Sequence, residues 1–194
     1  MLTSKHKAAT DFPIHDFLAE RWSADAFDGR TVTRADLLSL FEAARWAASS
    51  YNEQPWSYIV ATKDEPEEFA KMLSCLSESN QAWAKSASVL VLAIVNTKLA
   101  RNGKENRAAV HDLGLASANL VFEATSRGLV VHQMAGILPE KAKSLYNVPD
   151  DCEVWTALAI GYPGTELHPT EEKPRRRKKL QDFVFSGNWG KSFT

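Results

Sequence analysis

The sequence predicts an α+β fold. Three observations support this class: helical and strand patterns follow one another without the regular βαβ alternation of a doubly wound sheet, the apolar run at 88–96 is typical of a central strand, and 194 residues fit one ordinary domain. The hydrophobic fraction of 44% and the charged fraction of 24% are those of a folded globular protein. We expect one domain over 1–194, with loosely held residues at 1–14 and a C-terminal extension at 170–194.

The first half of the chain predicts helices and strands around one loop. Thr33 is suited to cap a helix at 34–47, and Asp36 places an acid in its first turn, where the helix dipole favours negative charge. Asn52 and Pro55 indicate a loop at 49–56. The other elements expected here are a short helix at 17–21, a strand at 57–62, a helix at 66–76 and the central strand at 88–96.

The second half is dominated by a long helix at 106–127, which ends at Gly128. Its apolar positions surround much of the helix and its small residues permit close packing, so we expect it to be well buried and a candidate for a subunit interface. The remaining expected elements are strands at 129–133 and 154–160, a helix at 139–146 and a small apolar segment at 180–185.

Composition and charge argue against several classes of protein. The formal net charge of −1 does not favour a general nucleic-acid binder, whose affinity depends on excess Lys and Arg. Two cysteines, Cys75 and Cys152, are too few for a disulfide scaffold or a four-cysteine zinc site, and we expect both thiols to be inert. The longest apolar run, 87–95, is under half of the about 20 residues that a membrane span needs, and the N-terminus lacks a signal-peptide pattern. We expect a cytoplasmic protein with no membrane and no nucleic-acid partner.

Familiar catalytic motifs are absent from the sequence. It has no GxGxxG fingerprint, no GxxxxGK[ST] phosphate loop, no GxSxG nucleophile elbow and no HExxH metal pair. His111 and Asp112 are adjacent on a predicted helix and diverge by about 100°, so they cannot hold one metal ion together. None of these motifs supplies a catalytic centre, and we expect no metal site.

Four short segments rich in polar residues lie between or at the ends of predicted helices and strands. Arg21-Trp22-Ser23 offers a guanidinium and a hydroxyl to an anionic oxygen, and residues 49–56 offer hydroxyl and amide groups to the edge of a heterocycle. At 132–136 a strand ends in a glycine that lets the backbone approach a ligand, and 173–179 hold six cations suited to a phosphate. Each group alone also fits a structural explanation: a solvated pair, a capped turn, a strand-ending turn or a solvated tail.

Together these groups resemble, in order and spacing, the nitroreductase family of FMN-dependent oxidoreductases. The resemblance covers about residues 17–185 and is carried by the segments ERWSADAFDGR, FEAARWAASSYNEQPWSYIV, DLGLASANLVFEATSRGL, HQMAG and IGYPG. It implies a sheet of four to five strands flanked by helices, and an obligate homodimer with two FMN sites at the subunit interface.

The resemblance also implies which residues bind FMN. The Arg-x-Ser motif would hold the phosphate and the flavin edge, and a C-terminal basic pair would grip the phosphate. A Ser-Ser-x-Asn-x-Gln loop would meet the flavin from the partner subunit, and an amide would face the pyrimidine end of the ring. The backbone of Ala135 and Gly136 would lie near flavin N5. The full expected set is Arg21, Trp22, Ser23, Asp25, Ser49, Ser50, Asn52, Gln54, Asn80, Gln133, Met134, Ala135, Gly136, Arg175 and Arg177.

Several positions depart from the family pattern. Asp25 stands where the family usually has a second Arg, so Arg30 or the basic segment would have to supply the missing cation. Ala48 replaces a common Pro, residues 137–138 (Ile-Leu) replace Phe-Asp, and Lys179 replaces a Pro.

The activity implied by the resemblance is ping-pong transfer of a hydride. NADH or NADPH would reduce FMN at N5, and a small electron-poor acceptor (a nitroaromatic, quinone, flavin or activated alkene) would be reduced in turn. The alternatives are a sibling flavoenzyme with a different reduced-FMN chemistry, a flavin-binding or regulatory protein with little turnover, and nucleic-acid binding through 173–179. Tryptophans could wall the pocket, although we expect most of the six to be in the core.

Overall fold

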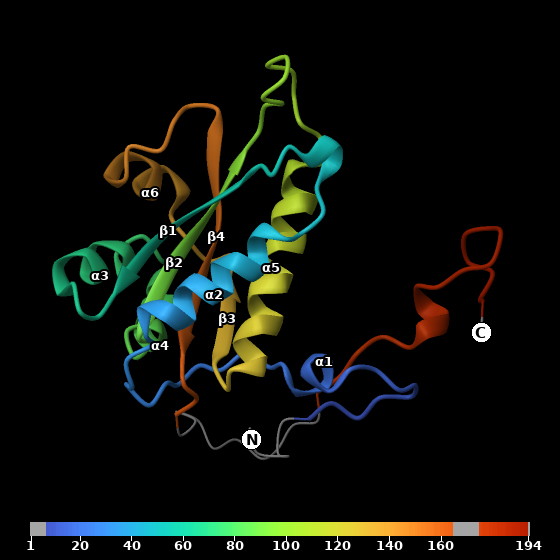
Figure 1. Cartoon of the computed structure of the whole chain (residues 1–194). Coiled ribbons are helices and arrows are strands. Elements are labelled where there is room, and N and C mark those ends of the chain that lie inside the picture. The colour runs from blue at the N-terminus through green and yellow to red at the C-terminus, as the bar shows by residue number, and fades with distance from the viewer. Residues whose placement is uncertain (1–6, 165–174, 194) are drawn as a thin grey trace.

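The computed structural model describes residues 7–164 and 175–193. One antiparallel sheet has the strand order β1-β2-β4-β3 (Figure 1). Its strands are β1 (Trp56–Thr62), β2 (Val89–Asn96), β3 (Val130–Met134) and β4 (Cys152–Gly161). The helices of the described residues are α1 (Asp16–Glu20), α2 (Arg34–Arg45), α3 (Pro66–Leu73), α4 (Glu78–Ala84), α5 (Ala109–Ser126) and α6 (Pro139–Leu145). The predicted α+β class is confirmed, with four strands.

Helices cover both faces of the sheet. Along β2, Leu90, Leu92 and Ile94 pack in the cluster that includes residues of α3, α4 and α6. The alternate residues of β2 pack in a second cluster with α2 and α5. Residues 89–95 are all at most 4% exposed, which confirms the prediction of a central strand buried on both faces.

The start of α2 follows the predicted capping pattern. Thr33 Oγ1 accepts the backbone N–H of Asp36 at 3.1 Å and donates to Asp36 Oδ2 at 2.7 Å. Arg127, just past α5, donates to Asp36 Oδ1 at 3.1 Å. The Thr33 hydrogen bond, and after it Arg127, lowers the pKa of Asp36 below its usual value. This contact joins α2 to the end of α5.

Most element boundaries differ from the prediction by one or two residues, and three differences are larger. The helix predicted at 66–76 ends at Leu73, and a separate helix, α4, follows at 78–84. The sequence did not predict α4, a helix of seven residues that lacks the proline found at the start of α3 and α6. The long helix begins at Ala109 rather than 106, and the apolar segment at 180–185 contains a 3-10 turn at Leu180–Asp182.

The tryptophans lie nearer the surface than expected. Trp46, Trp155 and Trp189 are 78%, 45% and 93% exposed, and the other three are partly buried. The expectation that most tryptophans lie in the core was wrong. Trp46 caps the end of α2, Trp155 lies on the part of β4 that extends beyond β3, and Trp189 lies in the C-terminal segment.

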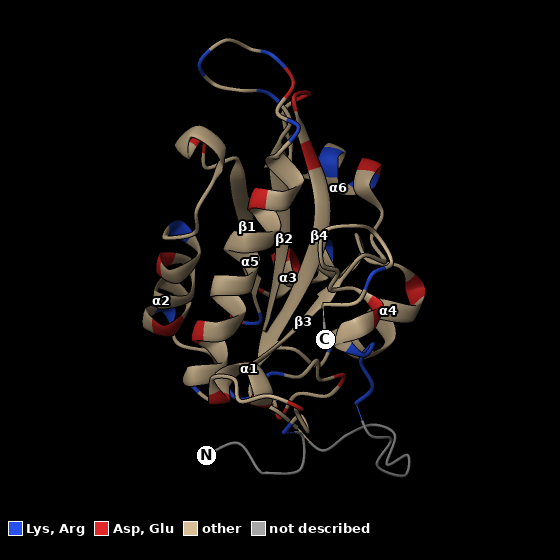
Figure 2. Cartoon of the chain, turned by 90° about the vertical axis from the view of Figure 1, so that its right-hand side faces the viewer, with Lys and Arg blue, Asp and Glu red and all other residues tan. Residues whose placement is uncertain are grey.

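The C-terminal segment returns to α1 and then leaves the body of the molecule. Arg175 Nη1 donates to the Ala19 carbonyl at 3.0 Å, and the segment at 177–193 then extends away from the sheet (Figure 1). Figure 2 shows a run of Lys and Arg along its first part. Lys173 and the first six residues lie outside the described residues. Within 7–164 and 175–193, no helix is long and apolar enough to cross a membrane.

Candidate functional site

Three arginines from the two ends of the chain gather beside α1. Arg21 follows this helix directly, and Arg175 is tied to it through the Ala19 carbonyl. Burial lowers the pKa of Arg21, and the positive charges of Arg175 and Arg177 lower it further. Clustered like charges raise the energy of the protein alone and favour a bound anion. The cluster is therefore suited to hold a phosphate through charge-assisted hydrogen bonds.

The segment that carries Arg21 is fixed against β3 and α4. Ala24 is fully buried, and its carbonyl oxygen accepts a hydrogen bond from His132 Nδ1 at 2.8 Å. The Trp83 ring of α4 stacks on His132, with the ring centroids 4.4 Å apart. Arg21 Nη1 donates to Ser23 Oγ at 3.4 Å. The two predicted anion-binding groups thus lie side by side on an anchored segment.

The basic segment, and not Arg30, supplies the cations beside Arg21. Arg30 pairs with Asp28 and lies over the Tyr162 ring, 3.9 Å from its centroid. The like charges that act on Arg21 come from Arg175 and Arg177. Asp25, which is partly buried, follows the fully buried Ala24 in this segment.

The turn after β3 is bound to the start of α4. The Gly136 carbonyl oxygen accepts hydrogen bonds from the backbone N–H of Ser77 and from Asn80 Nδ2, both at 2.9 Å. A Cβ at position 136 would lie 2.6 Å from Asn80 Nδ2 and 2.8 Å from Ser77 Oγ, so glycine leaves room for both side chains in their present positions. Among the described residues, the N–H groups of Ala135 and Gly136 have no acceptor, which leaves both donors available to a ligand.

The side chains of this turn face different surroundings. Met134 is buried in the core and contributes packing, whereas Gln133 and Ala135 are exposed. Ala135 and Ile137 also line a cavity of about 500 Å³ between the turn, α6 and β4. That volume falls in the usual range for small-molecule pockets.

The predicted loop at 49–54 has a strained backbone. Tyr51, Asn52 and Gln54 have φ values of 54°, 56° and 48°, which are left-handed conformations that residues other than glycine rarely adopt. Ser49 Oγ accepts the N–H of Gln54 at 3.0 Å, and Gln54 Nε2 donates to the Asn52 carbonyl at 3.2 Å. Backbone strain of this kind is concentrated at functional sites, where surrounding contacts maintain it.

The predicted loop residues and the predicted arginines form two groups at opposite ends of α5. The loop lies at the N-terminal end of α5, and α1 with its arginines lies at the other end (Figure 1). Because α5 has 18 residues, at about 1.5 Å each it separates the two groups by about 27 Å. One copy of the chain therefore does not bring the loop to the arginines.

A model of the nitroreductase family matches residues 18–162, most of the chain. The chain belongs to the nitroreductase family. This family is FMN-dependent and takes electrons from NAD(P)H, so the expected family, enzyme class and cofactor are confirmed.

Individual relatives agree with this membership. An uncharacterized 15.4 kDa protein of Mycolicibacterium smegmatis is 32% identical over 66% of this chain and 88% of that protein. The major NAD(P)H-flavin oxidoreductase of Aliivibrio fischeri is 26% identical over 88% of this chain and 96% of its own length. A crystal structure of an oxidoreductase containing FMN superimposes with a TM-score of 0.88 at 31% identity, over 98% of this chain and 100% of the other.

The residues present fit FMN. The arginine cluster matches a dianionic phosphate in charge, and the two available N–H donors at Ala135 and Gly136 match the acceptor atoms of a flavin ring. Asn80 uses Nδ2 for Gly136, which leaves its Oδ1 to accept a hydrogen bond from a ligand. Burial raises the pKa of the Cys75 and Cys152 thiols, which disfavours the reactive thiolate form of both.

The contacts that support this site had no signal in the sequence, although His132 lies in the HQMAG segment. Ser77, Trp83 and His132 fix the turn and the Arg21 segment through contacts between segments that are far apart in the chain. Asp112, considered in the sequence only as a metal ligand, contacts the loop instead. Within the described part of the chain, no three His, Cys, Asp or Glu side chains are grouped to hold a metal ion.

Proposed function

We propose that this nitroreductase-family chain catalyses ping-pong transfer of reducing equivalents from NADH or NADPH to a small electron-poor acceptor: a nitroaromatic, a quinone, a flavin or an activated alkene. When bound, FMN would supply the redox chemistry through its N5 position. The protein's own task is to bind the cofactor, orient its ring and leave one face open to two successive planar partners. No side chain is required as a nucleophile or general acid.

The arginine cluster carries this proposal. Arg21, Arg175 and Arg177 come from distant parts of the sequence, and their charges act on one another. Binding a phosphate would relieve this repulsion and give each guanidinium a charged acceptor. Ser23, hydrogen-bonded to Arg21, would add a hydroxyl donor to the same group.

The turn at 133–136 and Asn80 would hold the ring. The free N–H groups of Ala135 and Gly136 would donate to it, and Asn80 Oδ1 would accept from it. The Ser77 backbone N–H and the Asn80 side chain both donate to the Gly136 carbonyl oxygen and fix these positions, so little reorganisation is needed on binding. Trp22 packs against the adjoining core cluster and would support the Arg21 segment from behind.

A homodimer would complete each site. The loop at 49–54, about 27 Å from the arginines of its own chain, would contact the flavin of the partner subunit. The outer face of α5 supports this arrangement, because Val110 and Leu115 are 39% and 38% exposed. The extended C-terminal segment also exposes apolar rings, with Phe183 at 55% and Phe193 at 70%.

An anaerobic absorption experiment tests the proposal. Purified protein is loaded with FMN, NADH or NADPH is added, and the flavin absorption band is followed before and after addition of menadione or a nitroaromatic. We expect the band to bleach and then to return on addition of the acceptor. Bound flavin that does not bleach would favour a carrier or a sibling chemistry. Salt-dependent binding of oligonucleotides without FMN binding would favour the nucleic-acid alternative.

A further inference from the structure

Asp112 is a buried carboxylate in the first turns of α5. The residue is 2% exposed, and it is the only ionisable residue among the buried polar residues of the described chain. Its Oδ2 accepts the backbone N–H of Ser50 at 2.9 Å, and its Oδ1 lies 3.2 Å from Nδ1 of the exposed His111. A carboxylate is costly to bury, so its burial against one loop N–H indicates a specific role for the contact.

The contact joins α5 to the strained loop at the position where the loop begins. Ser50 opens the one-turn 3-10 helix of the loop, and the left-handed residues follow directly after it. Asp112 provides the described acceptor for the Ser50 N–H. Without this acceptor the loop would lose its attachment to the rigid helix, and strained residues would be free to relax.

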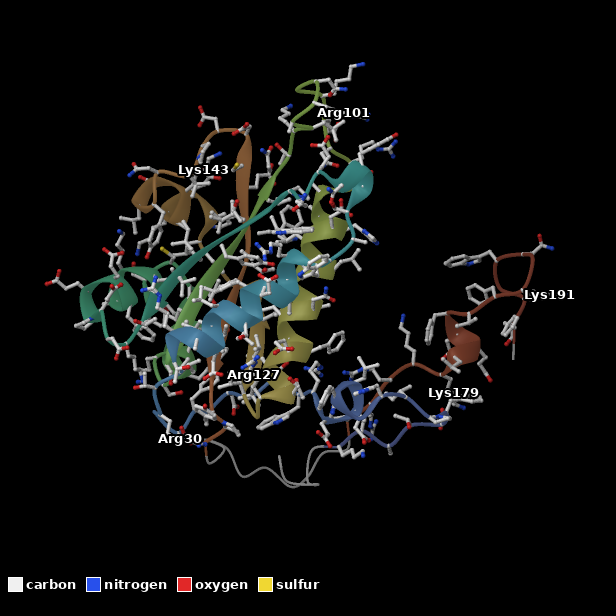
Figure 3. The ribbon with its side chains drawn as sticks, viewed as in Figure 1. Arg30, Arg101, Arg127, Lys143, Lys179 and Lys191 are labelled. Atoms are coloured by element: carbon white, nitrogen blue, oxygen red, sulfur yellow. The ribbon has the colours of Figure 1, made fainter. Side chains whose placement is uncertain are left out.

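The loop is also held by a second pair of contacts, with residues 100–101. Glu53 Oε2 accepts the backbone N–H of Ala100 at 2.8 Å, and the Arg101 guanidinium lies 3.8 Å from the centre of the Tyr51 ring. Figure 3 places Arg101 on the segment that projects beside this loop. The loop is therefore held from two sides, and Asp112 is its link to α5.

We infer that Asp112 is a positioning residue for FMN binding: through the Ser50 N–H it holds the loop at 49–54 in the shape that contacts the cofactor. The inference rests on the proposed function, because it takes the loop as a flavin contact. A purely structural role is the competing explanation, in which the carboxylate only stabilises the N-terminal part of α5. That role would affect stability but not the affinity for FMN.

Variants at Asp112 separate the two roles. Asp112→Ala removes the acceptor, whereas Asp112→Asn keeps an Oδ1 that can accept the Ser50 N–H. Ser117→Ala is the matched control, since Ser117 is also 2% exposed on α5 but bonds to Tyr58. FMN dissociation constants are measured by fluorescence quenching. The Tm of each FMN-free variant reports its stability, and its mass from sedimentation reports whether it still dimerises.

The same hydrogen bond can be removed from the loop side. Ser49, with φ −145° and ψ 154°, has the extended backbone that a following proline requires. Ser50→Pro therefore removes the N–H donor, and Ser50→Ala removes only the hydroxyl. The difference between these two variants isolates the N–H without a change in α5.

We expect Asp112→Ala to weaken FMN binding by about tenfold or more, Asp112→Asn to restore most of the affinity, and Ser50→Pro to bind more weakly than Ser50→Ala. The Ser117→Ala control should keep the wild-type affinity. If the wild-type chain binds FMN and Asp112→Ala binds it equally well, or loses affinity only because it no longer dimerises, the role of Asp112 is wrong. If the wild-type chain binds no FMN, the proposed function itself fails.

Discussion

Asn80 Nδ2 donates to the carbonyl oxygen of Gly136 across 2.9 Å, and so joins two residues 56 positions apart. The contact links α4 to the turn after β3, and the Ser77 N–H reinforces it. Through this link the amide of one segment and the free N–H groups of the other meet at one place. The geometry of the proposed flavin site depends on this approach.

The first prediction concerns Gly136. Gly136→Ala places a Cβ 2.6 Å from Asn80 Nδ2 and 2.8 Å from Ser77 Oγ, so both side chains must turn away and the hydrogen bond from Asn80 to the carbonyl of residue 136 is disturbed. We expect a loss of stability of about 1–3 kcal/mol, as for other overpacked sites, together with weaker FMN binding. Urea unfolding and an FMN titration measure the two effects. Wild-type values for both would show that the two segments do not need to be this close.

The second prediction concerns the arginine cluster. Arg21→Ala and Arg177→Ala should each weaken FMN binding about tenfold or more, because each removes a charged donor to the phosphate. The fold should remain intact, since removing one of three like charges relieves repulsion. Arg34→Ala, an exposed arginine at the start of α2, is the control and should bind FMN normally. Unchanged affinity in both cluster variants would refute the phosphate assignment.

Asp36 provides a pH-dependent prediction. Its pKa lies below the usual 3.8 in the folded chain, so its ionised form stabilises the fold above that pH, and this stabilisation is lost as the pH falls through the lower folded value. Because the site is partly exposed, Asp36→Asn should cost only about 0.5–1 kcal/mol at pH 7. Urea unfolding should show that the difference in the free energy of unfolding between the wild-type chain and Asp36→Asn becomes smaller toward pH 3. A difference that does not change with pH would contradict the role of Asp36.

The proposed dimer predicts that substituting two equally exposed leucines has different effects on dimer formation. Leu115 on α5 and Leu145 on α6 are 38% and 39% exposed, but they lie on opposite faces of the sheet. Leu115→Lys should dissociate the dimer, because it would bury a charge in the interface, while Leu145→Lys should leave the dimer intact. Sedimentation equilibrium distinguishes the outcomes. A monomeric wild-type chain, or a dimeric Leu115→Lys variant, would exclude α5 from the interface.

The sequence predicted those elements whose signals are local. The unbroken apolar pattern at 88–96 identified the central strand, and Thr33 with Asp36 identified the start of α2, because both depend on neighbouring residues. The exposed Trp155 shows the limit of such reasoning. Its strand continues past the end of β3, and strand length does not reveal which residues a neighbour covers.

The candidate site depended on contacts that no local pattern contains. Local patterns offered Arg21 and the basic segment separately. The family resemblance assigned both to the phosphate, and in the folded chain the charges of Arg175 and Arg177 act on Arg21. Asp112 was noticed for its neighbour His111, whereas the contact that matters joins it to Ser50, 62 positions away. The family resemblance named the loop and the turn, but the residues that hold them in place had no signal of their own.

The most direct test of the account compares the affinities of the wild-type chain for FMN and for riboflavin, which lacks the phosphate. If Arg21, Arg175 and Arg177 form the phosphate site, FMN should bind at least about a hundredfold more tightly at low salt, because the cluster supplies several charge-assisted hydrogen bonds. The difference should shrink as salt screens the charges. Equal affinity for the two flavins would contradict the account, since the arginine cluster would then not bind the cofactor.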